Sequence, residues 1–227
     1  MRVFFDNPWF SSLPGAEADA LLNAATSLRL ARGTFLFRQG DRFNASRDAF
    51  WGIASGMIKF CVNHQNGSEA ILTIFEPGIW FGETALLCRG PRTATAVALT
   101  DCELLAVSAA RFDTLMEGSA FARAIAALEA KRLQLTFGSL ADIALQSTRE
   151  RIARRLVRLA HGDVAQSNDE RRIVDICQDS IAMMLGVSRT TLNKELRALA
   201  KIGAIELRYG RIEIKDPALL IAVADGA

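Results

Sequence analysis

The sequence has few of the residues that build metal and redox sites. Its two histidines are far apart in the chain, and its four cysteines include no Cys-x-x-Cys pair: Cys61, Cys88, Cys102 and Cys177. This spacing does not match a zinc or iron–sulfur framework, so we interpret the cysteines as ordinary thiols and expect no metal. Clustered histidine and carboxylate ligands for a jelly-roll oxygenase are missing, and so is a nucleophile–base pair, which argues against an enzyme.

Long apolar runs are also missing. No stretch approaches the roughly 20 apolar residues that span a bilayer, and residues 1–10 lack the basic-then-apolar pattern of a signal peptide. Only five residues are proline, and half of the 227 residues are apolar. These values are typical of a globular chain long enough for two domains. We therefore expect a cytoplasmic protein with no membrane partner.

The small net charge is unevenly distributed along the chain. Residues 1–145 contain 13 Lys/Arg and 14 Asp/Glu, whereas residues 146–227 contain 14 and 11. The resulting charges are −1 and +3, which sum to the +2 of the whole chain. A basic bias in the shorter segment is expected if that segment binds a polyanion.

The first half of the chain predicts mostly β-structure. After a short helix over residues 16–28, turn residues separate six candidate strands, at 34–37, 49–54, 57–62, 70–75, 93–99 and 103–107. Many short strands at this spacing favour an antiparallel barrel or jelly roll. We assign this barrel to a first domain, residues 1–110, of an α+β protein.

Residues 119–145 predict one long helix. They contain no proline and a single glycine, Gly138, among many strong helix formers. Leu133, Thr136, Leu140 and Ile143 follow a 3-4-3 spacing that lines one face for a partner helix. A long helix that leaves a small barrel is typical of a homodimer seam; packing on the chain's own barrel is the alternative. We assign residues 111–146 to this dimerisation helix.

A capping box then restarts the helix. Ser147 and Glu150 have the spacing at which a hydroxyl and a carboxylate satisfy each other's free backbone amides. We place a hinge here and assign residues 147–227 to a C-terminal domain. One side of the next helix, residues 148–160, is basic, and the sequence leaves open whether this side has a function or is only a solvated face.

Residues 179–196 have the pattern of a helix-turn-helix. A first helix over 179–185 would end at Gly186, which can adopt the left-handed conformation, and Ser188 would cap a second helix. Val187 would fill the angle between the two helices. The inward face would consist of Ile181, Leu185, Leu192, Leu196 and Leu199.

The outward side of the second helix suits a DNA major groove, which requires small and basic side chains near the helix N-terminus. The candidate DNA-binding residues are Ser188, Arg189, Thr190, Asn193, Lys194 and Arg197. Residues 204–208 and 211–215 alternate around Tyr209-Gly210, which predicts a β-hairpin wing with basic tips for phosphate. We therefore predict a DNA-binding transcription regulator; the alternative is a small helical domain for protein contacts.

Residues 80–96 combine a strand, a glycine turn, one short helix, a loop and a second strand. Gly82 allows close approach of the backbone to a ligand, and amides at the start of the helix favour an anion. Arg92 offers a planar donor fork for phosphate, and Glu83 offers an acceptor for a sugar hydroxyl. The alternative is an ordinary Glu83–Arg92 ion pair in a barrel that binds no ligand.

The triplet Phe81-Gly82-Glu83, followed by Pro91-Arg92-Thr93, resembles the phosphate-binding cassette of the cyclic-AMP receptor protein/FNR family of bacterial regulators. The resemblance covers nearly the whole chain and implies barrel, long helix and winged helix-turn-helix in that order. It implies that Glu83 holds the ribose 2′-hydroxyl, while Arg92 and Thr93 hold the cyclic phosphate beside Gly82. Two further hydroxyls are implied, at Thr136 for the adenine base and at Thr73 in the pocket wall.

The resemblance also implies the effector and partners. We expect cyclic AMP as effector, and a palindromic operator, a second copy of the chain and RNA polymerase as partners. Phe137 departs from the family because it stands where the receptor has a second hydroxyl, which weakens the case for adenine. Thr190 replaces an acidic base reader, and Lys194 lacks the bidentate fork of arginine. The alternative effectors are haem, a gas or another small molecule, with His64 as the candidate haem ligand.

Overall fold

The computed structural model describes residues 2–164 and 171–226. The chain forms two compact units, Met1–Lys131 and Arg132–Ala227, and the boundary falls inside the long helix α6 (Ser119–Leu145). This helix has the extent predicted from its composition. The division into residues 1–110, 111–146 and 147–227 stays a prediction.

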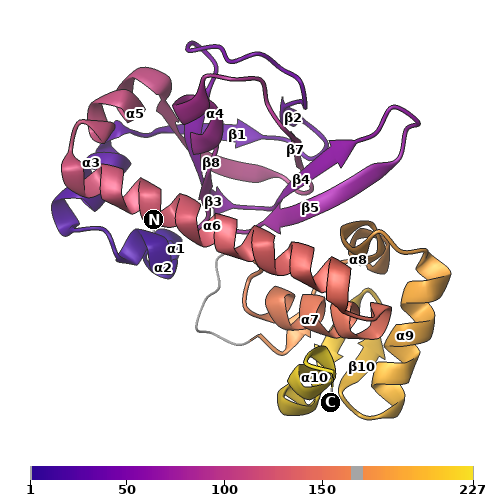
Figure 1. Ribbon diagram of the computed structural model, residues 1–227. Coiled ribbons are helices and arrows are strands. Elements are labelled where there is room, and N and C mark those ends of the chain that lie inside the picture. The colour runs from indigo at the N-terminus through magenta and orange to yellow at the C-terminus, as the bar shows by residue number, and fades with distance from the viewer. Residues whose placement is uncertain (1, 165–170, 227) are drawn as a thin grey trace. The chain divides into compact units, whose positions relative to one another are not determined.

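The first unit contains two four-stranded antiparallel sheets (Figure 1). In order, the first is formed by β1 (Thr26–Leu30), β8 (Cys102–Ser108), β3 (Ala49–Ser55) and β6 (Trp80–Phe81). The second is formed by β2 (Phe35–Phe37), β7 (Thr95–Ala98), β4 (Ile58–Asn63) and β5 (Glu69–Phe75). All six predicted strands are present within two residues at each end, so the expected barrel of short antiparallel strands is confirmed.

The N-terminal helices differ from the prediction. The segment expected to be helical over 16–28 forms α3 (Gly15–Ala24), and the chain then turns into β1. Thr26 and Ser27 favour helices weakly, and their backbones pair with Leu105 and Ala106 of β8. Long-range pairing therefore overrides the local pattern. The remaining helices of this unit are α1 (Arg2–Phe5), α2 (Pro8–Ser11), α4 (Glu83–Cys88) and α5 (Ala109–Met116).

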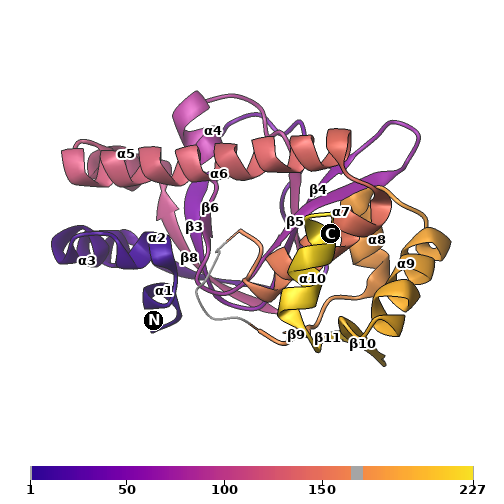
Figure 2. The ribbon, with the colours of Figure 1, turned by 60° about the horizontal axis from the view of Figure 1, so that its bottom comes forward.

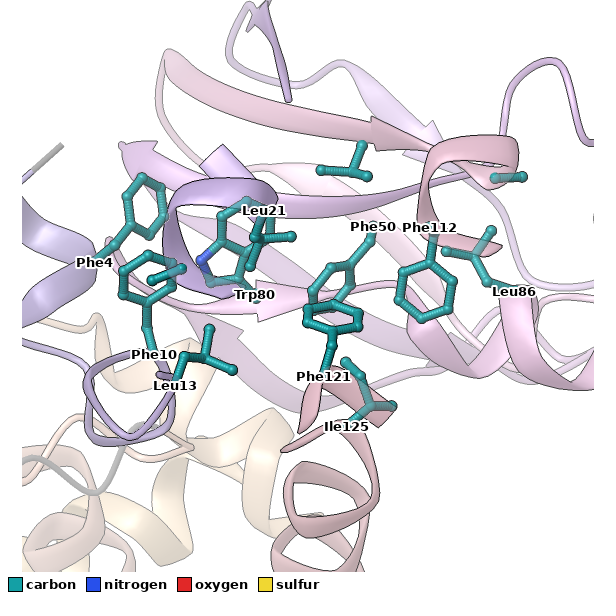
Figure 3. Close-up of a cluster of buried hydrophobic side chains, with 13 residues drawn as sticks. Phe4, Phe10, Leu13, Leu21, Phe50, Trp80, Leu86, Phe112, Phe121 and Ile125 are labelled. Carbon is teal, nitrogen blue, oxygen red and sulfur yellow. The ribbon is translucent and has the colours of Figure 1, made fainter. Parts of the chain in front are cut away.

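A cluster of aromatic and aliphatic side chains joins these helices to the first sheet (Figure 3). Trp80 of β6 lies 5.2 Å from Phe4 and 5.1 Å from Phe50, between ring centroids. Phe112 of α5 continues the cluster to Phe121, in the first turn of α6. Burial of large aromatic side chains dominates core energetics, so this cluster fixes the start of α6 to the barrel.

The barrel interior holds a second cluster of side chains, which consists of contacting aromatic rings. Its neighbouring ring centroids lie 4.9–6.4 Å apart, and its members are Phe37, Trp51, Phe60, Phe75 and Phe81. These rings come from β2, β3, β4, β5 and β6, so both sheets contribute. They form the apolar wall beside which the candidate site is built.

The second unit is a winged helical domain (Figure 2). Its helices after α6 are α7 (Thr148–Ala160), α8 (Gln178–Leu185), α9 (Arg189–Lys201) and α10 (Pro217–Ala224). Its sheet has the order β10 (Ile205–Arg208), β11 (Arg211–Ile214) and β9 (Ile173–Val174). The predicted capping box opens α7: the Ser147 amide donates to the Glu150 carboxylate over 2.9 Å, and the Glu150 amide donates to the Ser147 hydroxyl over 3.4 Å.

The basic side of α7 is held by internal partners. Arg155 pairs with Asp163 at 3.1 Å, and its side chain is only 11% exposed, so burial lowers its pKa against the opposing effect of the carboxylate. Arg158 pairs with Asp142 of α6 at 2.9 Å. The interpretation of this side as a solvated face is therefore wrong for both residues. Their guanidinium groups fix α7 to its surroundings within this unit.

Candidate functional site

Gly82 is required by the packing of the barrel. It has φ +103°, and a Cβ atom placed there would lie 2.5 Å from the ring of Trp51 and 2.7 Å from the carbonyl oxygen of Ala49. Any larger residue would therefore displace Trp51 or the β3 backbone. The carbonyl of Gly82 also accepts a 3.4 Å hydrogen bond from Nη1 of Arg92, so these two predicted site residues are brought together.

Arg92 is buried, with 6% of its surface exposed. Its guanidinium carbon lies 4.0 Å from the ring centroid of Phe37 and 5.0 Å from that of Trp51. Nη2 forms an ion pair with Asp48, 2.5 Å from Oδ1. The Nε atom is buried and has no hydrogen-bond partner among the described residues. A buried arginine with an unused donor is well suited to receive an anion.

The other predicted pocket residues differ in their surroundings. Glu83 is 3% exposed and accepts a 3.2 Å hydrogen bond from the Thr84 hydroxyl, in the first turn of α4. Thr73 is buried on β5 and pairs in register with Phe60 of the aromatic barrel wall, which puts the two side chains on the same face. Thr93 is exposed in the loop before β7.

The second half of α6 carries an exposed apolar face. Its large apolar side chains are between 53% and 61% exposed: Leu133, Phe137, Leu140 and Ile143. Thr136 is exposed on the same helix, and its hydroxyl donates to the Arg132 carbonyl over 2.9 Å. Contiguous exposed apolar surface of this kind marks an interaction site.

The predicted helix-turn-helix is confirmed in detail. Gly186 ends α8 in the left-handed conformation with φ +65°. The hydroxyl of Ser188 accepts a 3.0 Å hydrogen bond from the Thr191 amide and so caps α9. The predicted inward face is buried: Ile181, Leu185, Leu192, Leu196 and Leu199.

The outward side of α9 is accessible, as expected. Ser188, Arg189, Thr190, Lys194 and Arg197 are exposed, and Asn193 is half-buried. Nε of Arg189 lies 3.3 Å from a carboxylate oxygen of Asp179, with both side chains more than half exposed. An exposed ion pair contributes about 0–1 kcal/mol, less than the ~1–3 kcal/mol of a bidentate contact to guanine. Arg189 is therefore available to a base.

The wing also has the predicted form. Arg208 pairs in register with Arg211, which leaves Tyr209 and Gly210 as a two-residue turn. Gly210 has φ +73°, and the side chain of Tyr209 is fully exposed. The hairpin therefore presents its tip, with an arginine on each side, to solvent.

Asp48 was not predicted as a site residue. Its carboxylate holds Arg92, and the only sequence cue is an acidic residue directly before a strand. The alternative to a ligand site was an ion pair between Glu83 and Arg92. In the structure, the ion pair of Arg92 is with Asp48.

The cysteines and His64 occupy ordinary environments. Burial, reinforced by a hydrogen bond to Glu69, raises the pKa of the Cys61 thiol to about 11, so it stays protonated at neutral pH. His64 is exposed in the β4–β5 turn, where its Nδ1 accepts from the Asn66 amide over 3.3 Å. Within residues 2–164 and 171–226, no group of three metal-ligating side chains occurs. No described helix is long and apolar enough to cross a bilayer.

Both parts of the chain match known protein families. Residues 27–119 match a cyclic nucleotide-binding domain, and residues 150–223 match a Crp-like helix-turn-helix domain. Over 221 residues the chain is 32% identical to the cyclic AMP receptor protein of Thermus thermophilus, covering 97% of this chain and 98% of that protein. The crystal structure of the T. thermophilus catabolite activator protein matches with TM-score 0.54 and 32% identity, over 96% of this chain and 99% of that one.

A third relative shows the fold alone. The c-di-GMP responsive regulator CLP of Xanthomonas campestris is 23% identical, with TM-score 0.70, over 88% of this chain and 99% of that one. The domains, the capped α9 and the wing together define a DNA-binding transcription regulator with a cyclic-nucleotide-binding type of barrel. The chain belongs to the cyclic-AMP receptor protein/FNR family.

Proposed function

We propose that cyclic AMP binds in the barrel and thereby controls DNA binding by a homodimer. The observation that carries the proposal is Arg92, which is buried against aromatic rings and whose Nε donor has no acceptor in the described part of the chain. A cyclic phosphate carries one negative charge and oxygens that can accept from this fork. The likeness to the cyclic AMP receptor protein of T. thermophilus supports cyclic AMP as the particular nucleotide.

Each predicted pocket residue has a role in this proposal. Arg92 and Thr93 bind the phosphate beside Gly82, and Glu83 accepts from the ribose 2′-hydroxyl. Thr73 adds a hydroxyl to the wall beside Phe60. Thr136 of α6 contacts the base. Its hydroxyl, which donates to the Arg132 carbonyl in the free protein, would then donate to the ligand. The barrel, residues 1–110, is then the sensor, residues 111–146 the dimer helix and residues 147–227 the DNA-binding domain.

Switching would follow from a shift in population between two dimer states. The exposed apolar face of α6 supports a second copy of the chain as its partner. Cyclic AMP would favour the state in which two copies of α9 are about 34 Å apart, one helical turn of DNA. The operator is then palindromic. The proposal places this regulator in the cytoplasm and includes RNA polymerase as a partner, as the family resemblance implies.

Arg189 should supply sequence specificity. Arg189→Ala should weaken binding to the specific operator by roughly 1–3 kcal/mol, because a bidentate contact to a base is lost. Non-specific binding should fall less. Fluorescence anisotropy with operator and scrambled duplexes measures both, with Arg123→Ala, an exposed arginine of the first unit, as the control. Equal losses on the two duplexes would mean that Arg189 contacts phosphate only.

The proposal is tested by titration of the full chain. The protein is incubated with a pool of random DNA duplexes in the presence of cyclic AMP, cyclic GMP, c-di-GMP or no ligand, and the bound sequences are determined. Cyclic AMP should select a palindrome that the free protein does not select. Selection of the same palindrome without any ligand, or only with another nucleotide, would overturn cyclic AMP as effector and leave the DNA-binding function in place.

A further inference from the structure

The carboxylate of Asp48 is already paired with the Arg92 guanidinium, the group that we propose binds the effector. Asp48 lies directly before β3 and is 8% exposed. Its Oδ1 accepts from Nη2 of Arg92, and its Oδ2 accepts from the Asn44 amide over 2.7 Å. A second hydrogen bond, from the Asp48 amide to the Asn44 carbonyl over 2.8 Å, closes the turn. The carboxylate is therefore built into a fixed turn of the barrel.

The Asp48–Arg92 ion pair makes the binding of an anion at Arg92 less favourable. In the free protein the single positive charge of Arg92 is already balanced by Asp48, and both groups are shielded from water. A phosphodiester that approaches Arg92 therefore meets a neutral ion pair instead of a free cation, and it brings a second negative charge to the one guanidinium. Like charges that share one cation in a poorly solvated site repel each other strongly. Phosphate binding therefore weakens the Asp48–Arg92 pair, whether the phosphate uses the Nε donor or displaces the carboxylate from Nη2.

We propose that Asp48 is an internal competitor for the phosphate of the effector and sets the concentration at which the regulator responds. This inference rests on the proposed binding of a cyclic nucleotide at Arg92. The carboxylate stabilises the free protein by compensating a buried cation, and the same stabilisation is lost when the ligand takes over the guanidinium. Asp48 thus lowers effector affinity, opposite to a residue that only positions Arg92 for the ligand.

Asp48→Asn tests the direction of the effect. The amide keeps the size of the side chain and removes the competing charge. It has one acceptor oxygen, so it can accept from Arg92 or from the Asn44 amide but not from both. Calorimetric affinity of the full-length variant for cyclic AMP should rise about tenfold. The ligand-free variant should melt at a lower temperature, because Arg92 loses its buried counter-charge. Its stabilisation by saturating cyclic AMP should be larger than in the wild type.

Matched controls distinguish competition at Arg92 from a general effect of removing a carboxylate on the affinity for cyclic AMP. Asp101→Asn makes the same substitution at an exposed carboxylate of the same unit, which accepts from the Arg32 amide, and should leave the affinity unchanged. The Asp48→Asn gain should disappear in an Arg92→Ala background. If Asp48→Asn folds poorly, the 13C signal of the Asp48 carboxyl group in the wild type should still shift on saturation with cyclic AMP.

The outcomes distinguish the inference from the proposed function. A wild type that binds cyclic AMP, together with an Asp48→Asn variant of equal or weaker affinity, or an unshifted Asp48 carboxyl signal, would overturn the competition and keep the effector. Cyclic AMP binding by Asp48→Asn but not by the wild type would support competition by Asp48. No binding of cyclic AMP or cyclic GMP by either protein would overturn both.

Discussion

Replacing Arg92 with alanine should weaken cyclic AMP binding by about 100-fold or more, because charge-assisted hydrogen bonds in a buried site are lost. The guanidinium is the buried cation of the cassette, beside the carbonyl of Gly82 and close to the rings of both Phe37 and Trp51. Isothermal titration calorimetry measures the affinity directly. Operator binding that depends on cyclic AMP should be lost in parallel.

Two further variants at the cassette make this result specific. Arg92→Lys keeps the charge but loses the planar fork, so its affinity should fall between those of wild type and alanine. Arg89→Ala removes a neighbouring arginine whose ion pair with Asp113 is about half exposed, and it should keep wild-type affinity. Near-ultraviolet circular dichroism checks that each variant is folded. Unchanged affinity in a folded Arg92→Ala protein would show that this arginine does not bind the nucleotide.

Some parts of this structure are readable from sequence because their determinants are local. Turn residues separate the six predicted barrel strands, and the Gly186 turn with the Ser188 cap predicts the helix-turn-helix within a residue or two. Each of these features depends on residues a few positions apart. Helix α9 is amphipathic enough that its accessible residues follow from the pattern alone.

Other parts depend on contacts between distant segments, and local patterns do not reveal them. Asp48 reaches Arg92 across 44 positions, and nothing near Asp48 marks it as the partner. Thr26 and Ser27 leave the helix because strand β8, some 80 residues later, offers a partner. The role of Arg158 becomes visible only with Asp142 in place. The candidate binding residues are therefore visible in the sequence, whereas the ion pairs of Arg92 and Arg158 are not.

The apolar face of α6 leads to the second large effect. Leu140→Glu should convert the dimer to a monomer at micromolar concentration, with the dissociation constant raised by roughly 100-fold or more, because burying an unpaired carboxylate in an apolar seam is very costly. Leu140 is 56% exposed in the single chain, between Leu133 and Phe137 on one side and Ile143 on the other. Sedimentation equilibrium measures the change.

The loss of dimerisation should carry over to DNA binding without damage to the sensor. A monomer presents one copy of α9 and contacts one half-site, so the affinity for a full palindrome should fall steeply, while a single half-site is bound as before. Gln134→Glu adds the same charge to an exposed position off the apolar face and should leave the dimer intact. If Leu140→Glu stays dimeric and binds the palindrome normally, the exposed face of α6 is not the seam. The two recognition helices must then be brought together by another surface of the chain.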